Sequence, residues 1–433
     1  MFCFPPHPLT RPCLAAGLDC RIAEGRADLV VGGETALTIA DAAAVRLLAA
    51  LVAGETPAGT VAELAAAERQ LLAAGVLTVE FLASPGGAVA ARLSSSGYAQ
   101  PLRLGAPAAG WRLHRHAVLR PEGSGWRLTS PLSSYELQLA SAGLVDGVQT
   151  DAAGSGDELG ALLARALWAG ALTEAPDDAC EAPAWSHEDL MFHAASRRHA
   201  DHRPRGKRTS RPDWAPPMPA AKPGAALGDD LRQRLDAVTF ESVLASRRSV
   251  RGPLPPPTLD ELRDLLRIVQ AERGERPTAP CRSYPMAGGL QSLDFHLVTA
   301  ARADAPAALH RFDAATGGLQ PVAAPQGSAQ RLLEEAAQGW GVGHGLPCAL
   351  LVITARLPEL GARYEAIAYR LALLEAGCAT QLLTEVATAL GLATCVLGNG
   401  DSELFALASG VPEWQAPAIA EIAVAGRLRP PQR

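Results

Sequence analysis

A basic, proline-rich stretch near the middle of the chain divides the sequence into two parts that we expect to fold separately. Residues 185–224 begin with a helical pattern, WSHEDLMFHAASRR, and continue as a run of Arg, Lys, His and Pro without apolar periodicity. Proline and clustered like charges interrupt helices and strands and are typical of linkers. The sequence therefore predicts a helix and connector over 183–230, followed by a C-terminal domain over 231–433.

Composition excludes several classes of protein. The chain has 433 residues, of which 48% are hydrophobic and 19% charged, with a net charge of −6, so it is expected to be globular and soluble. The acidic balance argues against a general nucleic-acid binder. The sequence contains no apolar run of about 18 residues and no signal-peptide pattern. We therefore expect a cytoplasmic protein that does not associate with membranes.

The histidines and cysteines do not predict a metal site. No CxxC pair occurs among the eight cysteines, so free cytosolic thiols are expected. His187, His193, His199 and His202 are spaced so that three of them do not share one helical face, and we expect solvated or capping side chains.

The N-terminal part contains a faint internal duplication. ELAAAERQLLAAGVLT at 63–78 and ELGALLARALWAGALT at 158–173 align without gaps, and each predicts a helix followed by a short strand. A strand and a shorter helix are expected before each copy, as DLVVGG with DAAAVRLLAAL and as GWRLTS with SSYELQLA. The pattern predicts two winged-helix-like modules, 1–100 and 101–182. Their second helices carry few basic residues, which favours peptide or protein binding over DNA binding, with a purely structural role as the alternative.

The C-terminal part alternates helical and strand patterns. Apolar strands are expected at DFHLVTA, PCALLVITARL, ATCVLG and AIAEIAVAGRLR, and HRFDAATGGLQPVA has the pattern of a hairpin. Residues 364–390 predict a long helix that ends at Gly391. This order is typical of an α+β fold with long helices packed on one sheet.

Two features of this part point to a phosphate-bearing, planar ligand. Arg247, Arg248, Ser249 and Arg251 offer charge-assisted hydrogen bonds to a phosphate, although a solvated cationic helix end is the alternative. SYPMAGGLQ and LGNG are glycine-containing turns whose backbone can approach a ligand closely. Neither turn matches GxGxxG or a P-loop, so a Rossmann or P-loop site is not predicted.

In this order and spacing, SRRSVRG, SYPMAGGLQSLDFHLV and YRLALLEAGCATQLLTEVATALGLATCVLG resemble the FMN-dependent nitroreductase superfamily. Within it, HRFDAATGGLQPV and WSHEDLMFHAASRR are similar to the SagB/ThcOx-type azoline dehydrogenases of ribosomal-peptide biosynthesis. The specific resemblance covers about residues 185–428, and the N-terminal modules match the peptide-binding domains of these enzymes only in arrangement.

The resemblance implies a nitroreductase-like domain that binds FMN at a homodimer interface built from both chains. An apolar stripe on the long helix, Ile367, Leu371, Leu374, Cys378 and Leu382, suits that interface, and core packing within one subunit is the alternative. The residues that match the cofactor positions are Arg247, Ser249, Arg251 and Arg427 for the phosphate and ribityl chain, Ser283, Pro285, Gly288 and Gly289 at the isoalloxazine edge, and Leu397 and Gly398 near the ring.

The catalytic signature of the family is Lys–Tyr before the long helix, where this chain has Arg363–Tyr364. Arginine cannot accept a proton, so the resemblance assigns Tyr364 as the base and Arg363 as the cation that favours its phenolate. Tyr369 and Arg370 are candidate substrate contacts, with surface packing as the alternative. Cys378, where relatives often have His, is expected to be a small buried residue.

The implied activity is oxidation of thiazolines or oxazolines in a precursor peptide to azoles, with dioxygen reoxidising the flavin. The N-terminal modules would position a leader peptide or a partner cyclodehydratase. Two alternatives stay open: an NAD(P)H-dependent flavin oxidoreductase acting on another substrate, and a catalytically altered scaffold of a peptide-modifying complex.

Overall fold

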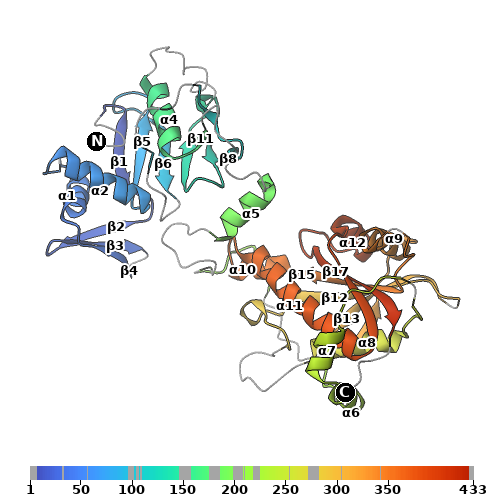
Figure 1. Cartoon of the computed structure of the whole chain (residues 1–433). Coiled ribbons are helices and arrows are strands. Elements are labelled where there is room, and N and C mark those ends of the chain that lie inside the picture. Colours follow the sequence, from blue (N-terminus) through green and yellow to red (C-terminus); the bar gives the residue numbers. More distant parts are fainter. Residues whose placement is uncertain are drawn as a thin grey trace. The chain divides into compact units, whose positions relative to one another are not determined.

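The computed structural model consists of two compact units, Met1–Arg205 and Gly206–Arg433, each with its own sheets and helices (Figure 1). The division falls within the predicted connector. In the part of the chain that is described, no helix is long and apolar enough to cross a membrane. The described residues are 7–31, 34–55, 57–95, 102–103, 107, 110–145, 158–174, 186–197, 208, 210–217, 225–252, 254–271, 282–303, 305–341 and 343–428.

The N-terminal unit is built on one six-stranded antiparallel sheet in the order β1-β5-β6-β10-β9-β8. A second sheet has the order β2-β3-β4, and β7 pairs with β11. The strands are β1 Thr10–Leu14, β2 Asp19–Ala23, β3 Arg26–Val31, β4 Glu34–Ile39, β5 Leu77–Leu82, β6 Val89–Ser95, β7 Arg112–Leu113, β8 Val118–Glu122, β9 Gly125–Thr129, β10 Tyr135–Leu139 and β11 Thr173–Glu174. The helices are α1 Ala42–Ala53, α2 Val61–Ala73, α4 Glu158–Ala169 and α5 His187–Arg197.

The internal duplication is visible as two helix–strand pairs, α2 with β5 and α4 with β11. One prediction was wrong: SSYELQLA is the strand β10 rather than a helix. Its residues alternate between buried Tyr135, Leu137 and Leu139 and half-buried polar positions, which is the period of a strand. Strands from both predicted modules join one sheet and one hydrophobic core, and the boundary near residue 100 stays a prediction.

The C-terminal unit is a mixed α/β structure around a six-stranded antiparallel sheet in the order β14-β13-β12-β15-β17-β16, as the alternation of patterns predicted. Its strands are β12 Leu293–Thr299, β13 Ala308–Asp313, β14 Gly318–Pro321, β15 Ala349–Ala355, β16 Leu392–Leu397 and β17 Ala418–Arg427. Its helices are α6 Asp229–Asp236, α7 Phe240–Ser246, α8 Leu259–Gln270, the 3-10 turn η1 Ala287–Gly289, α9 Ser328–Trp340, α10 Leu357–Arg363, α11 Ala368–Ala389 and α12 Ser402–Ser409.

Helices cover both faces of this sheet, because alternate residues of its strands are apolar on both sides. On one face, Phe295 and Leu297 pack with α8 and α11. On the other face, Val298 and Val352 pack with α9 and α12. Figure 1 shows α11 lying across the sheet. The two faces of the sheet therefore border different regions, one around α11 and the other around α12.

Candidate active site

The glycine-rich loop and the Arg–Tyr pair, far apart in sequence, meet at one point. Gly288 has φ +57°, and a Cβ at this position would collide with the hydroxyl of Tyr364. The same Cβ would lie 3.5 Å from Nε of Arg363. A side chain at this position would displace the Tyr364 hydroxyl, and the positive φ also favours glycine, so the predicted catalytic pair lies beside the predicted ring-binding loop.

The position of Tyr364 depends on a break between two helices. The sequence predicted one helix over 364–390, but α10 ends at Arg363, Tyr364 has the extended dihedrals φ −121° and ψ 153°, and α11 begins only at Ala368. This start of the helix was wrongly predicted. Tyr364 caps α10 with a backbone hydrogen bond to Leu360 O, so its side chain leaves the helix axis where the chain turns.

A segment within the predicted connector fixes the end of α10. The backbone N–H of Arg208 donates to Arg363 O at 2.8 Å, and its guanidinium Nε donates to Gly361 O at 2.7 Å. Carbonyls in the last turn of a helix lack partners within the helix, so these bonds satisfy two of them. Nε of Arg363 is buried without a hydrogen-bond partner among the described residues.

Sequence patterns assigned no role to Glu375, which anchors the glycine-rich loop. Its Oε2 accepts hydrogen bonds of 2.9 Å from Ala287 N and from Ser292 Oγ, on either side of Gly288 and Gly289. Burial raises the pKa of Glu375, although these hydrogen bonds oppose the shift. A charged residue on the buried face of an apolar helix is the signal that would have identified it.

The basic cluster lies at a different place, beside the start of β16. The chain leaves α7 at Arg247, and Val250 N donates to Thr394 O at 3.0 Å. A cleft of about 370 Å³ opens here, lined by Ser246, Arg248, Val250, Thr388, Gly391, Leu392, Ala393 and Leu428. Arg248 therefore faces the cleft, and the predicted phosphate ligands Arg247, Ser249 and Arg251 are exposed beside it.

The chemistry of this cluster fits a phosphate group. In the described part of the chain, the guanidiniums of Arg247, Arg248 and Arg251 make no ion pair. Three neighbouring cations repel one another, and a dianion relieves that repulsion with charge-assisted hydrogen bonds. Arg427 ends β17 opposite Leu392, which lines the cleft, and its guanidinium lies 3.9 Å from the Glu261 carboxylate.

The ring-binding loop and the basic cluster lie toward opposite ends of α11. Ala287 is bonded to Glu375 in the first half of the helix, whereas the cleft at Arg248 includes Thr388 near its end. At 1.5 Å per residue, Glu375 and Thr388 are about 20 Å apart along the helix axis. One chain therefore does not bring Gly288 into contact with Arg248.

Leu397 ends β16 at the edge of the sheet, and Gly398 follows the strand. Gly398 has open space where a Cβ would be, so its backbone is accessible to a ligand. Leu397 is paired with Glu421 of β17, and a Cβ on Gly400 would lie 2.5 Å from the Glu421 carboxylate. Burial, and then the charges of Asp401 and Glu335, raise the pKa of Glu421 to about 7.

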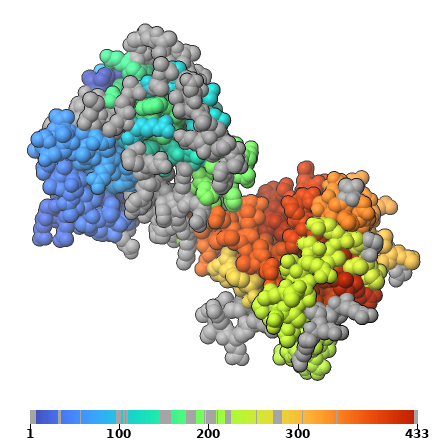
Figure 2. All heavy atoms as spheres, viewed as in Figure 1, coloured from blue at the N-terminus to red at the C-terminus, as the bar shows by residue number. Residues whose placement is uncertain are grey.

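The predicted interface stripe is only partly exposed: Ile367, Leu371 and Leu382 are half-buried, and Leu382 packs against the core of its own chain. Leu374 is 56% exposed and Cys378 is exposed, while the buried face of α11 is formed by residues such as Ala372, Ala376 and Leu383. Core packing is therefore the wrong alternative for Leu374, and the expectation of a buried Cys378 was wrong. In Figure 2 the orange atoms of α11 form part of the surface.

The two candidate substrate residues occupy the first turn of α11. Tyr369 is exposed and Arg370 is half-buried, and they follow Tyr364 by five and six residues. Ser283 and Pro285 are exposed at the start of the glycine-rich loop, and Gly289 has φ +74°. Of the four histidines expected to be solvated or capping, His187 and His193 lie on α5, and His199 and His202 fall outside the described residues.

Comparison with known proteins identifies a nitroreductase family domain at residues 244–424. FMN is the cofactor of that family. A comparison with curated proteins found no match.

Solved structures are similar to about half of the chain. A nitroreductase candidate from Ralstonia eutropha JMP134 is 20% identical, with 50% of this chain and 98% of that chain covered and a TM-score of 0.37. The microcin synthetase McbBCD complex of E. coli, with truncated pro-MccB17 bound, is 19% identical over 49% and 89% of the two chains, with a TM-score of 0.35. A nitroreductase candidate from Desulfovibrio desulfuricans in complex with FMN is 17% identical over 48% and 91%, with a TM-score of 0.29.

Proposed function

We propose that the nitroreductase family domain is an FMN-dependent dehydrogenase that oxidises thiazoline or oxazoline rings of a ribosomally made peptide to azoles. The observation that carries this proposal is the meeting of Gly288, Tyr364 and Arg363 at one point. Removal of a proton beside a flat ring requires three groups. These are a hydroxyl that acts as the base, a permanently charged cation and a backbone surface without side chains. The order of the sequence motifs supports the choice of azolines as substrates.

Tyr364 and Arg363 divide the proton chemistry. FMN, when bound, supplies the acceptor for the hydride that leaves the ring carbon. The Tyr364 hydroxyl, as phenolate, takes the proton from the neighbouring carbon, which lies α to the C=N bond. Arg363 stays charged throughout and stabilises the phenolate without exchanging a proton. Dioxygen is the final acceptor of the two electrons and leaves as hydrogen peroxide.

Two copies of the chain form the complete cofactor site in this proposal. Arg247, Ser249 and Arg251 would hold the phosphate end, and Gly288 and Gly289 the ring. Because these groups lie toward opposite ends of α11 and the helix exposes part of an apolar stripe, two antiparallel copies of α11 put the loop of one chain beside the cluster of its partner. The N-terminal unit would hold the leader of the precursor peptide or a cyclodehydratase.

The test is oxidation of a defined thiazoline peptide in air by purified protein. We expect flavin absorbance in the protein, loss of two hydrogen atoms per ring by mass spectrometry, and one hydrogen peroxide per azole formed. A colourless protein that takes up no FMN contradicts the proposal. If the protein rapidly oxidises NAD(P)H with a nitroarene and forms no azole, it is an NAD(P)H-dependent flavin reductase, which is the alternative function.

A further inference from the structure

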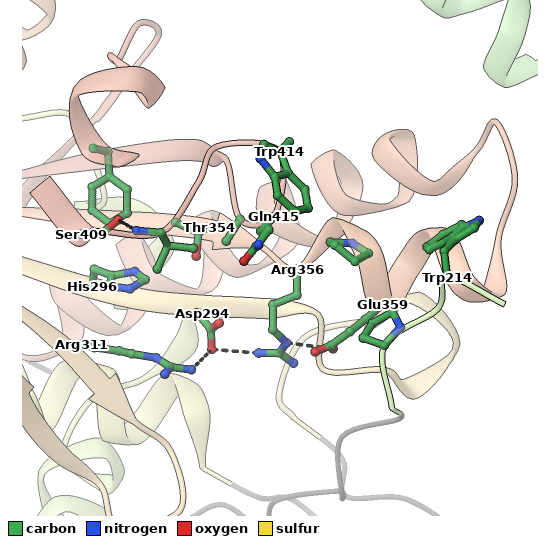
Figure 3. Close-up of a pocket in the computed structure, with 15 residues that line it drawn as sticks. Trp214, Asp294, His296, Arg311, Thr354, Arg356, Glu359, Ser409, Trp414 and Gln415 are labelled. Carbon is green, nitrogen blue, oxygen red and sulfur yellow. Dashed lines mark hydrogen bonds and ion pairs between the residues drawn. The ribbon is translucent and has the colours of Figure 1, made fainter. Parts of the chain in front are cut away.

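A pocket lies on the α12 side of the sheet, away from α11. It has a volume of about 510 Å³, which is within the range of sites for small molecules or short peptides. Figure 3 shows a row of ion-paired side chains along one side, Trp414 across from it and Trp214 at one end. Trp414 is 71% exposed and Trp214 is 59% exposed. Two large aromatic surfaces left in water at the rim of one pocket favour a partner that covers them.

Two polar atoms of the pocket are buried without a hydrogen bond of normal geometry in the described part of the chain. Thr354 is 1% exposed, and its Oγ1 makes no hydrogen bond among the described residues. His296 is 7% exposed, and its Nδ1 makes no hydrogen bond of normal geometry within that part of the chain, although the ring interacts with the Val352 backbone. Burial lowers the pKa of His296 to about 4, so its ring is neutral at pH 7. Buried polar atoms normally find partners, so these two indicate a ligand with hydrogen-bonding groups.

The charges of the pocket are balanced within the protein. Asp294 Oδ1 accepts from Arg356 at 2.8 Å and from Arg311 at 3.1 Å, and Arg356 also pairs with Glu359 at 2.8 Å. Although burial opposes it, these arginines hold the pKa of Asp294 below its usual range. Two cations and two anions leave no net charge for a ligand to neutralise. The pocket therefore favours an uncharged ligand over an anion or a cation.

We propose that this pocket binds an uncharged segment of the peptide substrate, with a proline or aromatic residue against Trp214 and Trp414 and a backbone amide at Thr354 and His296. A peptide group carries both a donor and an acceptor, and a flat or cyclic side chain fits an aromatic rim. This inference rests on the proposed function for the identity of the peptide. The pocket would then be a docking site that selects and aligns the substrate.

The pocket is connected to the catalytic pair by α10. Arg356, Pro358 and Glu359 line the pocket at the start of this helix, and Arg363 and Tyr364 stand at its end. Seven helical residues span about 10 Å, the length of about three residues of extended peptide. Arg356 N also donates to Ser292 O at 2.8 Å, directly after the glycine-rich loop. A docked residue would therefore lie about three or four residues from the ring that reacts.

Binding is tested with the acetylated and amidated tripeptide Gly-Pro-Phe, titrated into the full chain by calorimetry. We expect Trp414→Ala and Thr354→Val each to weaken binding about tenfold. Leu407→Ala, at an exposed position of α12 outside the pocket, is the matched control and should bind like the wild type. Thr354→Val removes an unpaired buried hydroxyl, so its melting temperature should not fall, which separates lost binding from lost folding.

A second arm uses an azoline peptide with Pro-Phe placed three or four residues from the ring. Thr354→Val should raise KM about tenfold and leave kcat unchanged, because docking stabilises substrate and transition state equally. Equal affinity of the tripeptide for the wild type and both pocket variants overturns the proposal. Binding of indole without binding of the tripeptide overturns it as well. If no azoline is oxidised, the proposed function is contradicted. The calorimetric titration still shows whether the pocket binds the tripeptide.

Discussion

Tyr364 is the residue on which the proposed chemistry depends. Tyr364→Phe keeps the ring and removes only the hydroxyl above Gly288, so azole formation should fall about 10²–10⁴-fold while FMN content is retained. Single-turnover mass spectrometry of a thiazoline peptide measures the fall. Arg363→Lys keeps a cation at the site and should retain activity, whereas Arg363→Met should lose it. Activity of Tyr364→Phe equal to that of the wild type would remove Tyr364 from the mechanism.

Gly288 tests the same site through the backbone. Gly288→Ala places a methyl group against the Tyr364 hydroxyl, so we expect the pair to be displaced and azole formation to fall at least about tenfold. Gly327→Ala is the matched control, because Gly327 also has a positive φ, +81°, but has nothing within 4 Å of the added carbon. Both variants carry a backbone penalty of about 1 kcal/mol. Equal activity in the two variants would contradict a role for the close contact.

At the scale of the element, α11 should form the interface between two copies of the chain. Leu374→Asp introduces a charge into the partly exposed apolar stripe, so we expect the protein to become monomeric and to lose FMN. Analytical ultracentrifugation and the flavin absorbance spectrum measure the two effects. Leu407→Asp on α12 is the control, since Leu407 is similarly exposed outside the stripe. A wild type that is monomeric with full FMN would refute the shared site.

Glu421 on strand β17 should make the stability of the protein depend on pH. Because the pKa of Glu421 in the folded state, about 7, lies above its ordinary value, its stabilising effect is complete at low pH and is lost as pH rises through 7. We expect the free energy of unfolding to fall by about 2 kcal/mol between pH 5.5 and 8. Urea denaturation at both pH values measures it. Glu421→Gln should remove most of the difference, and Glu413→Gln, at an exposed position, should leave it unchanged.

The elements show which parts of the site a sequence can predict. The apolar strand patterns correctly located β12, β15, β16 and β17. SSYELQLA was misassigned because the sheet partners β6 and β9, distant in sequence, decide its conformation. Thr354 and His296 were missed for a related reason: their importance comes from burial without full pairing, which depends on the packed structure.

At the scale of the whole molecule, each unit contains its own hydrophobic core, so the two units should be separable. Residues 206–433, produced alone, should bind FMN and oxidise a short azoline peptide with the kcat of the full chain. The KM for a full precursor peptide should rise at least about tenfold, because the proposed leader-binding unit is missing. Steady-state kinetics on both substrates measure the two effects.

The control for this truncation is the short peptide, which has no leader and should show equal KM with both proteins. Addition of residues 1–205 in trans should not restore the KM at micromolar concentration, because the linked unit acts through a high effective concentration. An unchanged KM for the full precursor would assign the N-terminal unit to another role, such as holding a partner cyclodehydratase. Loss of folding in residues 206–433 would instead contradict the independence of the two cores.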